Sequence, residues 1–340
     1  MPASQNAGMR AFHADHTEPR LPPGHRFPMH KYRLLREAVA RELPQLQVQA
    51  ADPASEGELA LVHAPSYVAA VLGGWLTAQQ QREIGFPWSP GMAERSRRSV
   101  GATVMAARAA LAEGVAANLA GGTHHAGVAQ GGGFCVFNDI AVAARLMQAE
   151  AWRHAGRNLR VAVIDLDVHQ GNGTAEVFSD DPSVYTLSIH GAKNFPFRKV
   201  ASDLDVDLPD ACGDEVYLAA LDRALAQLWA EHRERHDRDP DLLFYQAGVD
   251  VLAGDRLGRL QLSAPAVAER DRRVLAAALE RRIPLVLTMG GGYAEPIELT
   301  VSAQLSTLTL AAQAHQRWRS GVASAAQAKL TFMSRPAHPG

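Results

Sequence analysis

The sequence of 340 residues has little cysteine: only Cys135 and Cys212, far apart and without a CxxC pattern. A disulfide framework and a cysteine-based metal site are therefore both unexpected, and so few cysteines are typical of the reducing cytoplasm. The first residues lack the apolar stretch of a secretory signal, and no apolar run approaches the roughly 20 residues of a membrane span. We expect a cytoplasmic protein without a membrane span.

The sequence also lacks an excess of charge, because 34 Lys and Arg stand against 36 Asp and Glu, a formal net charge of −2. The basic footprint that grips nucleic acid is absent, so we expect no direct nucleic-acid binding. The composition is that of a globular protein, 47% hydrophobic and 21% charged. No repeat or low-complexity segment divides the chain. We predict a flexible N-terminus at 1–8, a single domain at 9–320 and a C-terminal tail at 321–340.

Short apolar runs alternate with helical segments along the chain. The runs are bounded by glycine or polar residues, which favours strands over buried helices. We predict strands at 115–119, 160–165, 184–189, 242–246 and 285–289, and helices at 93–113, 139–150, 215–233 and 265–281. Strands that are apolar on both faces and alternate with helices indicate a parallel sheet covered on both sides. The predicted fold class is α/β, a single three-layer domain with a central, mainly parallel sheet.

Polar residues of the kinds used in metal catalysis follow four of these strands. The ligand sites of open α/β sheets lie beyond the carboxyl ends of their strands, so we expect these residues to converge. Independent surface loops would not be expected to carry such residues together. In chain order they are the pair His124–His125, the segment Asp165–His169, Asp250 and Tyr293.

The spacing of Asp167 and His169 is the sharpest local signal. Two residues apart on extended backbone, their side chains point the same way. Carboxylate oxygen and imidazole nitrogen suit zinc, which in catalytic sites takes three protein ligands and leaves one position open. Asp250 is the natural third ligand. Taken alone, the segment could be a strand end with a capping acid, and His124–His125 could lie in an ordinary surface loop. Together, they favour a metal site.

Several ordered motifs resemble those of the zinc-dependent histone deacetylases, most closely the class IV branch. The resemblance extends from about His25 to about Ala303 and implies the arginase–deacetylase fold in a bacterial-type member. It further implies removal of acyl groups, acetyl or longer, from the ε-amine of lysine in a protein or peptide. The motifs are VHAPSYV at 62–68, IGFPWSPG at 84–91, the His124–His125 loop, GGFC at 132–135, DLDVHQGNG at 165–173, GDRLG at 254–258 and GGGY at 290–293.

The resemblance implies two ion sites. One holds a single Zn²⁺ on Asp167, His169 and Asp250. The other is a K⁺ site beneath it, held largely by backbone carbonyls, which leave almost no trace in a sequence. The matching positions for K⁺ are Asp165, Asp167, His169, Ser188 and Ile189.

The resemblance also implies the catalytic roles. His125 takes a proton from the attacking water and returns it to the leaving amine, while His124 holds the water and the developing charge. Asp165 orients His124, and Asn172 orients His125. Class I members have aspartate at the second of these positions, and a neutral amide makes His125 a weaker base. Tyr293 donates a hydrogen bond to the substrate carbonyl.

The substrate tunnel is expected at Gly133 and Phe134, with Phe195 as the opposite wall and Phe197 as its competitor. Two aromatic faces suit a slim aliphatic chain. Two other functions stay open: deacetylation of small acetylamines such as acetylpolyamines, and an inactive module that binds acyl-lysine. The complete set of ligands, histidines and Tyr293 argues against a pure binder, which needs no proton shuttle. The oligomeric state leaves no signal in the sequence.

Overall fold

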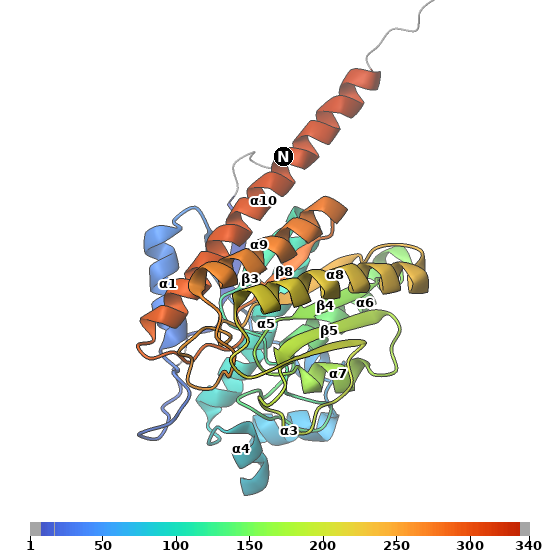
Figure 1. Cartoon of the computed structure of the whole chain (residues 1–340). Coiled ribbons are helices and arrows are strands. Elements are labelled where there is room, and N and C mark those ends of the chain that lie inside the picture. The colour runs from blue at the N-terminus through green and yellow to red at the C-terminus, as the bar shows by residue number, and fades with distance from the viewer. Residues whose placement is uncertain (1–7, 17, 334–340) are drawn as a thin grey trace, which may run out of the picture.

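The computed structural model describes residues 8–16 and 18–333, with side chains described up to residue 321, so most of the expected flexible N-terminus lies outside the described residues. In the described part, eight strands form one all-parallel sheet in the order β2-β1-β3-β8-β7-β4-β5-β6 (Figure 1). The predicted parallel α/β fold is confirmed. The strands are β1 Arg10–His13, β2 Gln47–Ala50, β3 Val115–Asn118, β4 Val161–Asp165, β5 Val184–Gly191, β6 Leu204–Leu208, β7 Leu242–Gln246 and β8 Leu285–Thr288.

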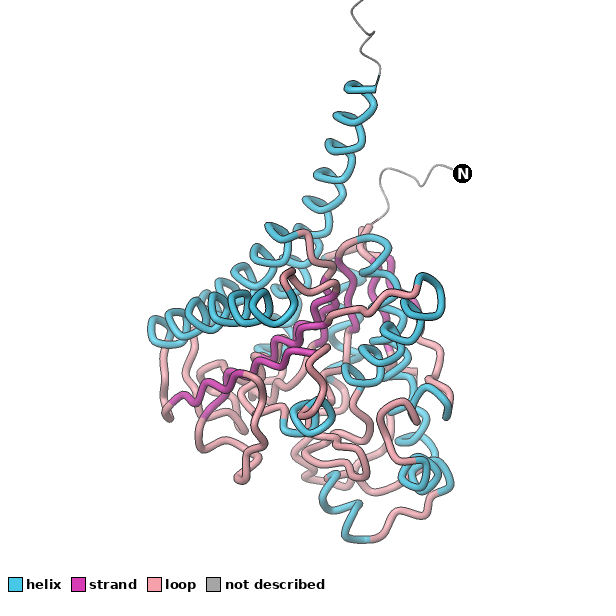
Figure 2. Tube along the Cα trace, turned by 90° about the vertical axis from the view of Figure 1, so that its right-hand side faces the viewer, coloured by secondary structure: helices cyan, strands magenta, loops and turns pink. Residues whose placement is uncertain are grey.

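Helices cover both faces of the sheet (Figure 2). One hydrophobic core lies between the sheet and α1, α8, α9 and α10, and the other between the sheet and α3, α5 and α6. The helices are α1 Lys31–Glu42, α2 Glu56–Leu59, α3 Pro65–Gly73, α4 Ala78–Ile84, α5 Pro90–Glu113, α6 Asp139–Ala155, α7 Asn172–Phe178, α8 Asp214–His236, α9 Ala264–Arg281 and α10 Glu298–Met333.

All five predicted strands and all four predicted helices are present, and most of their ends differ from the predicted ends by a few residues. Sequence reasoning missed β1, β2 and β6. β2 and β6 are the edge strands, and their residues are largely exposed or half-buried, so neither forms a continuous apolar run. β1 has only four residues. Short or half-exposed strands carry too few apolar positions for their period to stand out.

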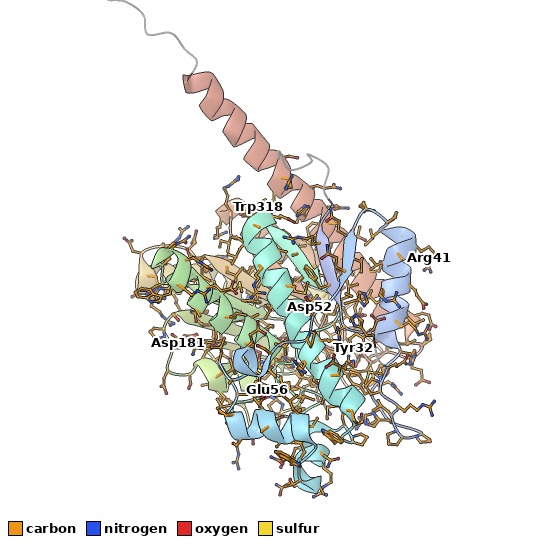
Figure 3. The ribbon with its side chains drawn as sticks, turned by 180° about the vertical axis from the view of Figure 1, so that it is seen from behind. Tyr32, Arg41, Asp52, Glu56, Asp181 and Trp318 are labelled. Carbon is orange, nitrogen blue, oxygen red and sulfur yellow. The ribbon has the colours of Figure 1, made fainter. Side chains whose placement is uncertain are left out.

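The long helices start and stop at recognisable signals. Ser89 caps α5 by accepting a hydrogen bond from the Met92 amide, with Pro90 at the first helical position. α5 ends at Gly114, where a Cβ would approach the Trp318 ring to 2.2 Å, so the packing of α10 against this end requires glycine (Figure 3). α10 continues through the predicted domain boundary at residue 320. None of the described helices is both long enough and apolar enough to cross a membrane.

Candidate active site

Four strands that precede predicted site residues lie side by side in the sheet, in the order β3-β8-β7-β4. Because the strands are parallel, their carboxyl ends share one edge. The loops that follow them bring together His124 and His125, the segment 165–169, Asp250 and Tyr293. The site therefore depends on the order of the strands in the sheet, which differs from their order along the chain.

Asp167, His169 and Asp250 form a buried cluster in which one potential ligand atom from each lies within 4.8 Å of the others. His169 Nδ1 lies 3.0 Å from Asp167 Oδ1 and 3.2 Å from Asp250 Oδ2. Backbone amides fix both carboxylates: Gly291 N donates to Asp167 Oδ2, and Val168 N donates to Asp250 Oδ1. Asp250 Oδ2 is fully buried and, apart from this contact with His169, has no hydrogen-bond partner among the described residues.

The charges of this cluster favour a cation. Burial and the repulsion of Asp167 raise the pKa of Asp250 to about 7. Against the effect of burial, hydrogen bonds to Asp167 and Asp250 raise the pKa of His169 to about 10. Two buried carboxylates that share a single imidazole nitrogen are costly unless positive charge compensates them. Two carboxylate oxygens and one imidazole nitrogen fit a divalent ion such as Zn²⁺.

His124 and His125 lie next to this cluster, with ring centroids 4.1 Å apart. Each ring has its own partner: His124 Nδ1 lies 2.6 Å from Asp165 Oδ2, and His125 Nδ1 lies 2.7 Å from Asn172 Oδ1. Such partners fix the tautomer and direct the Nε2 atoms away from these side chains. The structure therefore pairs both histidines with the residues expected from the sequence.

The pKa values of the two histidines are shifted in opposite directions. Burial lowers the pKa of His124, but attraction to Asp165 and Asp167 outweighs it and raises the pKa above its usual value. Burial lowers the pKa of His125 well below its usual value, and the charges of His124 and His169 add to the effect. Attraction to Asp165 and Asp167 thus favours the protonated form of His124, whereas burial favours the neutral form of His125, the form that can accept a proton.

Asp139 anchors the loop that carries these histidines, and sequence reasoning missed it. This fully buried carboxylate accepts hydrogen bonds from the amides of Gly122 and Thr123 and from the hydroxyls of Thr103 and Thr123. Gly121 and Gly122 adopt φ of +76° and +74°, which lets the chain turn sharply between β3 and the histidines. Asp139 opens α6, so from the sequence it is indistinguishable from an ordinary acidic residue in the first helical turn.

Replacing Asp139 with alanine is expected to lower the free energy of unfolding by about 3 kcal/mol or more, because several buried donors lose a charged acceptor. Urea unfolding of the purified variant measures the loss. Asp180, an exposed residue, provides the matched control, and Asp180→Ala should unfold at the wild-type urea concentration. An Asp139→Ala midpoint equal to that of the control would exclude the anchoring role.

Tyr293 is positioned by the loop that contains the GDRLG motif. Asp255 accepts hydrogen bonds from the amides of Tyr293, Leu257 and Gly258, and Arg256 Nε donates to the Tyr293 carbonyl at 3.0 Å. Burial raises the pKa of the Tyr293 hydroxyl well above its usual value, and the charge of Asp250 adds to the effect. The hydroxyl therefore stays protonated and can donate a hydrogen bond.

Two further buried cations surround the site, and neither was predicted. Lys31 Nζ lies 4.9 Å from the Tyr293 ring centroid and donates to the carbonyls of Gly290 and Gly292. Arg270 Nη1 donates to the carbonyls of Gly248 and Leu166, which lie two residues and one residue before the ligand candidates Asp250 and Asp167. Both are on helices that carry several exposed charged residues, so their sequence context hides their burial.

Asp271 pairs with Arg270 at 2.8 Å, and both side chains are fully buried. The hydroxyls of Tyr245 and Thr307 also donate to Asp271, at 2.5 and 2.6 Å. This satisfied ion pair connects β7, α9 and α10 beneath the loops of the site. Breaking one partner of such a pair is strongly destabilising, so it holds the loop ends in place.

The predicted tunnel residues line one cavity of about 590 Å³ together with His125, His169 and Tyr293. The Phe195 ring stands perpendicular to the His125 ring at 4.8 Å, whereas Phe197 is 90% exposed farther out. A Cβ at Gly133 would come within 2.5 Å of His125 and 2.9 Å of Phe195, so only glycine fits between them. Phe134 follows with φ of +69°. The volume lies in the range of small-ligand pockets.

The predicted potassium positions lie at the ends of β4 and β5. Asp165 and Ser188 are register partners on these neighbouring strands, and Ile189 follows directly. The Ser188 hydroxyl is 2.9 Å from His190 Nδ1. Potassium at this place stays a prediction.

Comparison with known proteins identifies a family and several relatives of this chain. The sequence model described as "Histone deacetylase domain" matches residues 25–310. An uncharacterized protein of Picosynechococcus sp. is 43% identical over 288 residues, which cover 84% of this chain and 92% of that protein. Histone deacetylase 2 of Arabidopsis thaliana is 32% identical, over 75% of this chain and 66% of that protein. The acetoin utilization protein AcuC of Bacillus subtilis is 31% identical, over 71% and 65%.

Solved structures of histone deacetylase homologues have a fold similar to that of this chain. A histone deacetylase homologue complexed with SAHA superposes with a TM-score of 0.72 at 25% identity, over 89% of this chain and 84% of that one. A homologue from Aquifex aeolicus has the same TM-score and identity, over 89% and 83% of the two chains.

Proposed function

Because the chain belongs to the histone deacetylase family, we propose that it is a zinc-dependent hydrolase that removes the acetyl group from the ε-amine of lysine in proteins or peptides. The observation that carries the proposal is the adjacent pair His124 and His125, each hydrogen-bonded through Nδ1, beside the Asp167–His169–Asp250 cluster. A module that only binds acyl-lysine has no use for this pair. Assignment to the class IV branch stays a prediction from the motifs at 84–91 and 254–258.

Zn²⁺ held by Asp167, His169 and Asp250 would polarise the amide carbonyl and acidify a water molecule. The residues of this chain supply the rest. His125 accepts a proton from the water and later returns it to the leaving lysine amine, so that the amine departs uncharged. His124, whose protonated form is favoured by Asp165, stabilises the negative charge that develops. Tyr293 donates its hydroxyl hydrogen to the carbonyl oxygen as that oxygen becomes negative.

The space around the catalytic groups favours a short acyl chain. A second cavity, of about 40 Å³, is lined by His124, His125, Gly133 and Tyr293 among others. It is large enough for only a few water-sized groups, since one such group takes roughly 10–15 Å³ on this scale. We therefore expect acetyl to be preferred over longer acyl groups.

A panel of substrates tests the proposal. The purified protein should hydrolyse an acetyl-lysine peptide, whereas myristoyl-lysine in the same peptide and acetylputrescine should react more slowly. Faster hydrolysis of acetylputrescine would point to the small-amine deacetylase instead. Tight binding of every peptide without release of any acyl group would point to the binding module.

Replacing Tyr293 with phenylalanine is expected to lower kcat by about 100- to 1,000-fold, the usual cost of losing one hydrogen bond to a developing oxyanion. The ring and its contact with Lys31 remain, so KM should change little. Steady-state kinetics with the acetyl-lysine peptide measure both constants. Tyr185→Phe, which removes a hydroxyl bonded to Glu231 away from the site, is the matched control. A Tyr293→Phe variant as fast as this control would remove the hydroxyl from the mechanism.

Replacing Asn172 with aspartate is expected to move the acidic limb of the pH–rate profile to higher pH. His125 must be neutral to accept a proton, and its pKa sets that limb. A carboxylate 2.7 Å from Nδ1 stabilises the protonated ring and raises this pKa, so the base becomes neutral only at higher pH. Profiles of kcat/KM between pH 5 and 9 give the comparison, and coincident acidic limbs would show that Asn172 does not orient the base.

A further inference from the structure

The mouth of the active-site cavity is rich in positive charge. Its lining includes one carboxylate, that of Glu83, and five exposed cationic side chains: Arg26, Arg82, Lys193, Arg256 and Arg259. The whole chain carries a net charge of −2, so this excess is local. On the basis of the proposed function, we propose that the mouth selects acyl-lysine residues flanked by aspartate or glutamate.

The cationic side chains come from four separate parts of the chain that the fold fixes around the cavity. Asn194 joins two of these parts, because its Nδ2 donates to the Leu257 carbonyl and its Oδ1 accepts from the Arg259 amide. The end of α4 is joined to the tunnel, because the amides of Gly133 and Phe134 donate to the carbonyls of Glu83 and Ile84. The charges therefore hold a defined position relative to the catalytic groups.

Nearby carboxylates neutralise only part of this charge. Asp210 binds Arg259 through two hydrogen bonds and lies 3.8 Å from Lys193, so one carboxylate serves two cations. Glu295 pairs with Arg256 at 3.2 Å.

Arg26 and Arg82 differ from these cations, because within the described residues neither side chain takes part in an ion pair. The three carboxylates of Glu83, Asp210 and Glu295 thus stand against five cationic side chains, and the mouth keeps a net positive charge. A cleft lined by charge of one sign concentrates ligands of the opposite sign and excludes those of the same sign.

An acidic peptide satisfies these features better than a basic one. Its carboxylates can reach Arg26 and Arg82 without displacing an existing partner. Phe197, exposed in the lining of the same cavity, offers an apolar surface to the extended peptide around the lysine. Lysine- and arginine-rich sequences, like polyamines, would place cations against cations, and like charges at a contact are costly.

Three peptides that share one acetyl-lysine but carry glutamate, serine or lysine at the flanking positions test the inference. We expect kcat/KM to fall in that order, with about a tenfold difference between the glutamate and lysine peptides at low salt. The difference should reside mainly in KM and shrink at high ionic strength, because salt screens exposed charges. Equal values for the three peptides, or a preference for lysine, would overturn the inference while leaving the proposed function intact. Hydrolysis of none of them would overturn the proposed function and this inference with it.

A charge reversal locates the preference. Arg82→Glu should lower the glutamate-to-lysine ratio of kcat/KM by about threefold or more, since it removes one cation from the mouth and adds an anion. Arg153→Glu changes the net charge equally on the exposed end of α6, outside the cavity, and should leave the ratio unchanged. If the two variants have the same ratio, the cations of the mouth do not select the substrate.

Discussion

Replacing His125 with alanine is expected to lower kcat by about 100- to 10,000-fold, with little change in KM. General acid–base catalysis contributes a factor of this size, and here one ring serves both proton transfers. The interaction is made in the transition state and not in substrate binding, which explains why KM should stay near its original value. Steady-state kinetics with the acetyl-lysine peptide measure both constants.

His124→Ala is the matched comparison, because it removes an adjacent imidazole that is also buried and also paired through Nδ1. Its deficit should be smaller, since the neutral base remains in place. A larger deficit for His124→Ala than for His125→Ala would reverse the two roles. Urea unfolding of both variants establishes whether either loss of rate comes from loss of structure.

Replacing Asp250 with alanine is expected to abolish activity and to remove the bound metal. Only Asp167 and His169 would remain, and catalytic zinc normally needs three protein ligands. Mass spectrometry of the metal content should find about one zinc per wild-type chain and almost none in the variant. Asp222→Ala, at an exposed carboxylate that pairs with Arg273, is the control and should retain the metal.

Thermal unfolding supplies a readout that does not depend on activity. A ligand that binds only the folded state stabilises it, by about 2.7 kcal/mol at one hundred times its dissociation constant. Zinc added to chelator-treated protein should therefore raise the Tm of wild type and not that of Asp250→Ala. An equal rise in both proteins, or full zinc occupancy in the variant, would exclude Asp250 from the ligand set.

The sequence by itself determined the class of fold and the residues that converge. Apolar runs at 160–165, 242–246 and 285–289 are strands because they are short, bounded by polar residues or glycine, and apolar on both faces. Because this pattern predicts a parallel sheet, the carboxyl ends of its strands must lie at one edge. The residues that follow those strands are then close together, whichever way the helices pack.

Other features depended on contacts between segments distant in the chain, and only the tertiary structure decided them. In the sequence, Asp139 has the pattern of an ordinary first residue of a helix, and Arg270 is one of several charged residues on α9. Their functions come from the carbonyls and amides that the folded chain places around them. The positive charge at the cavity mouth likewise arises because four segments distant in the chain meet there, whereas the net charge does not show where charges are located. Periodicity and spacing report on neighbours along the chain, whereas burial, pairing and local charge depend on neighbours in space.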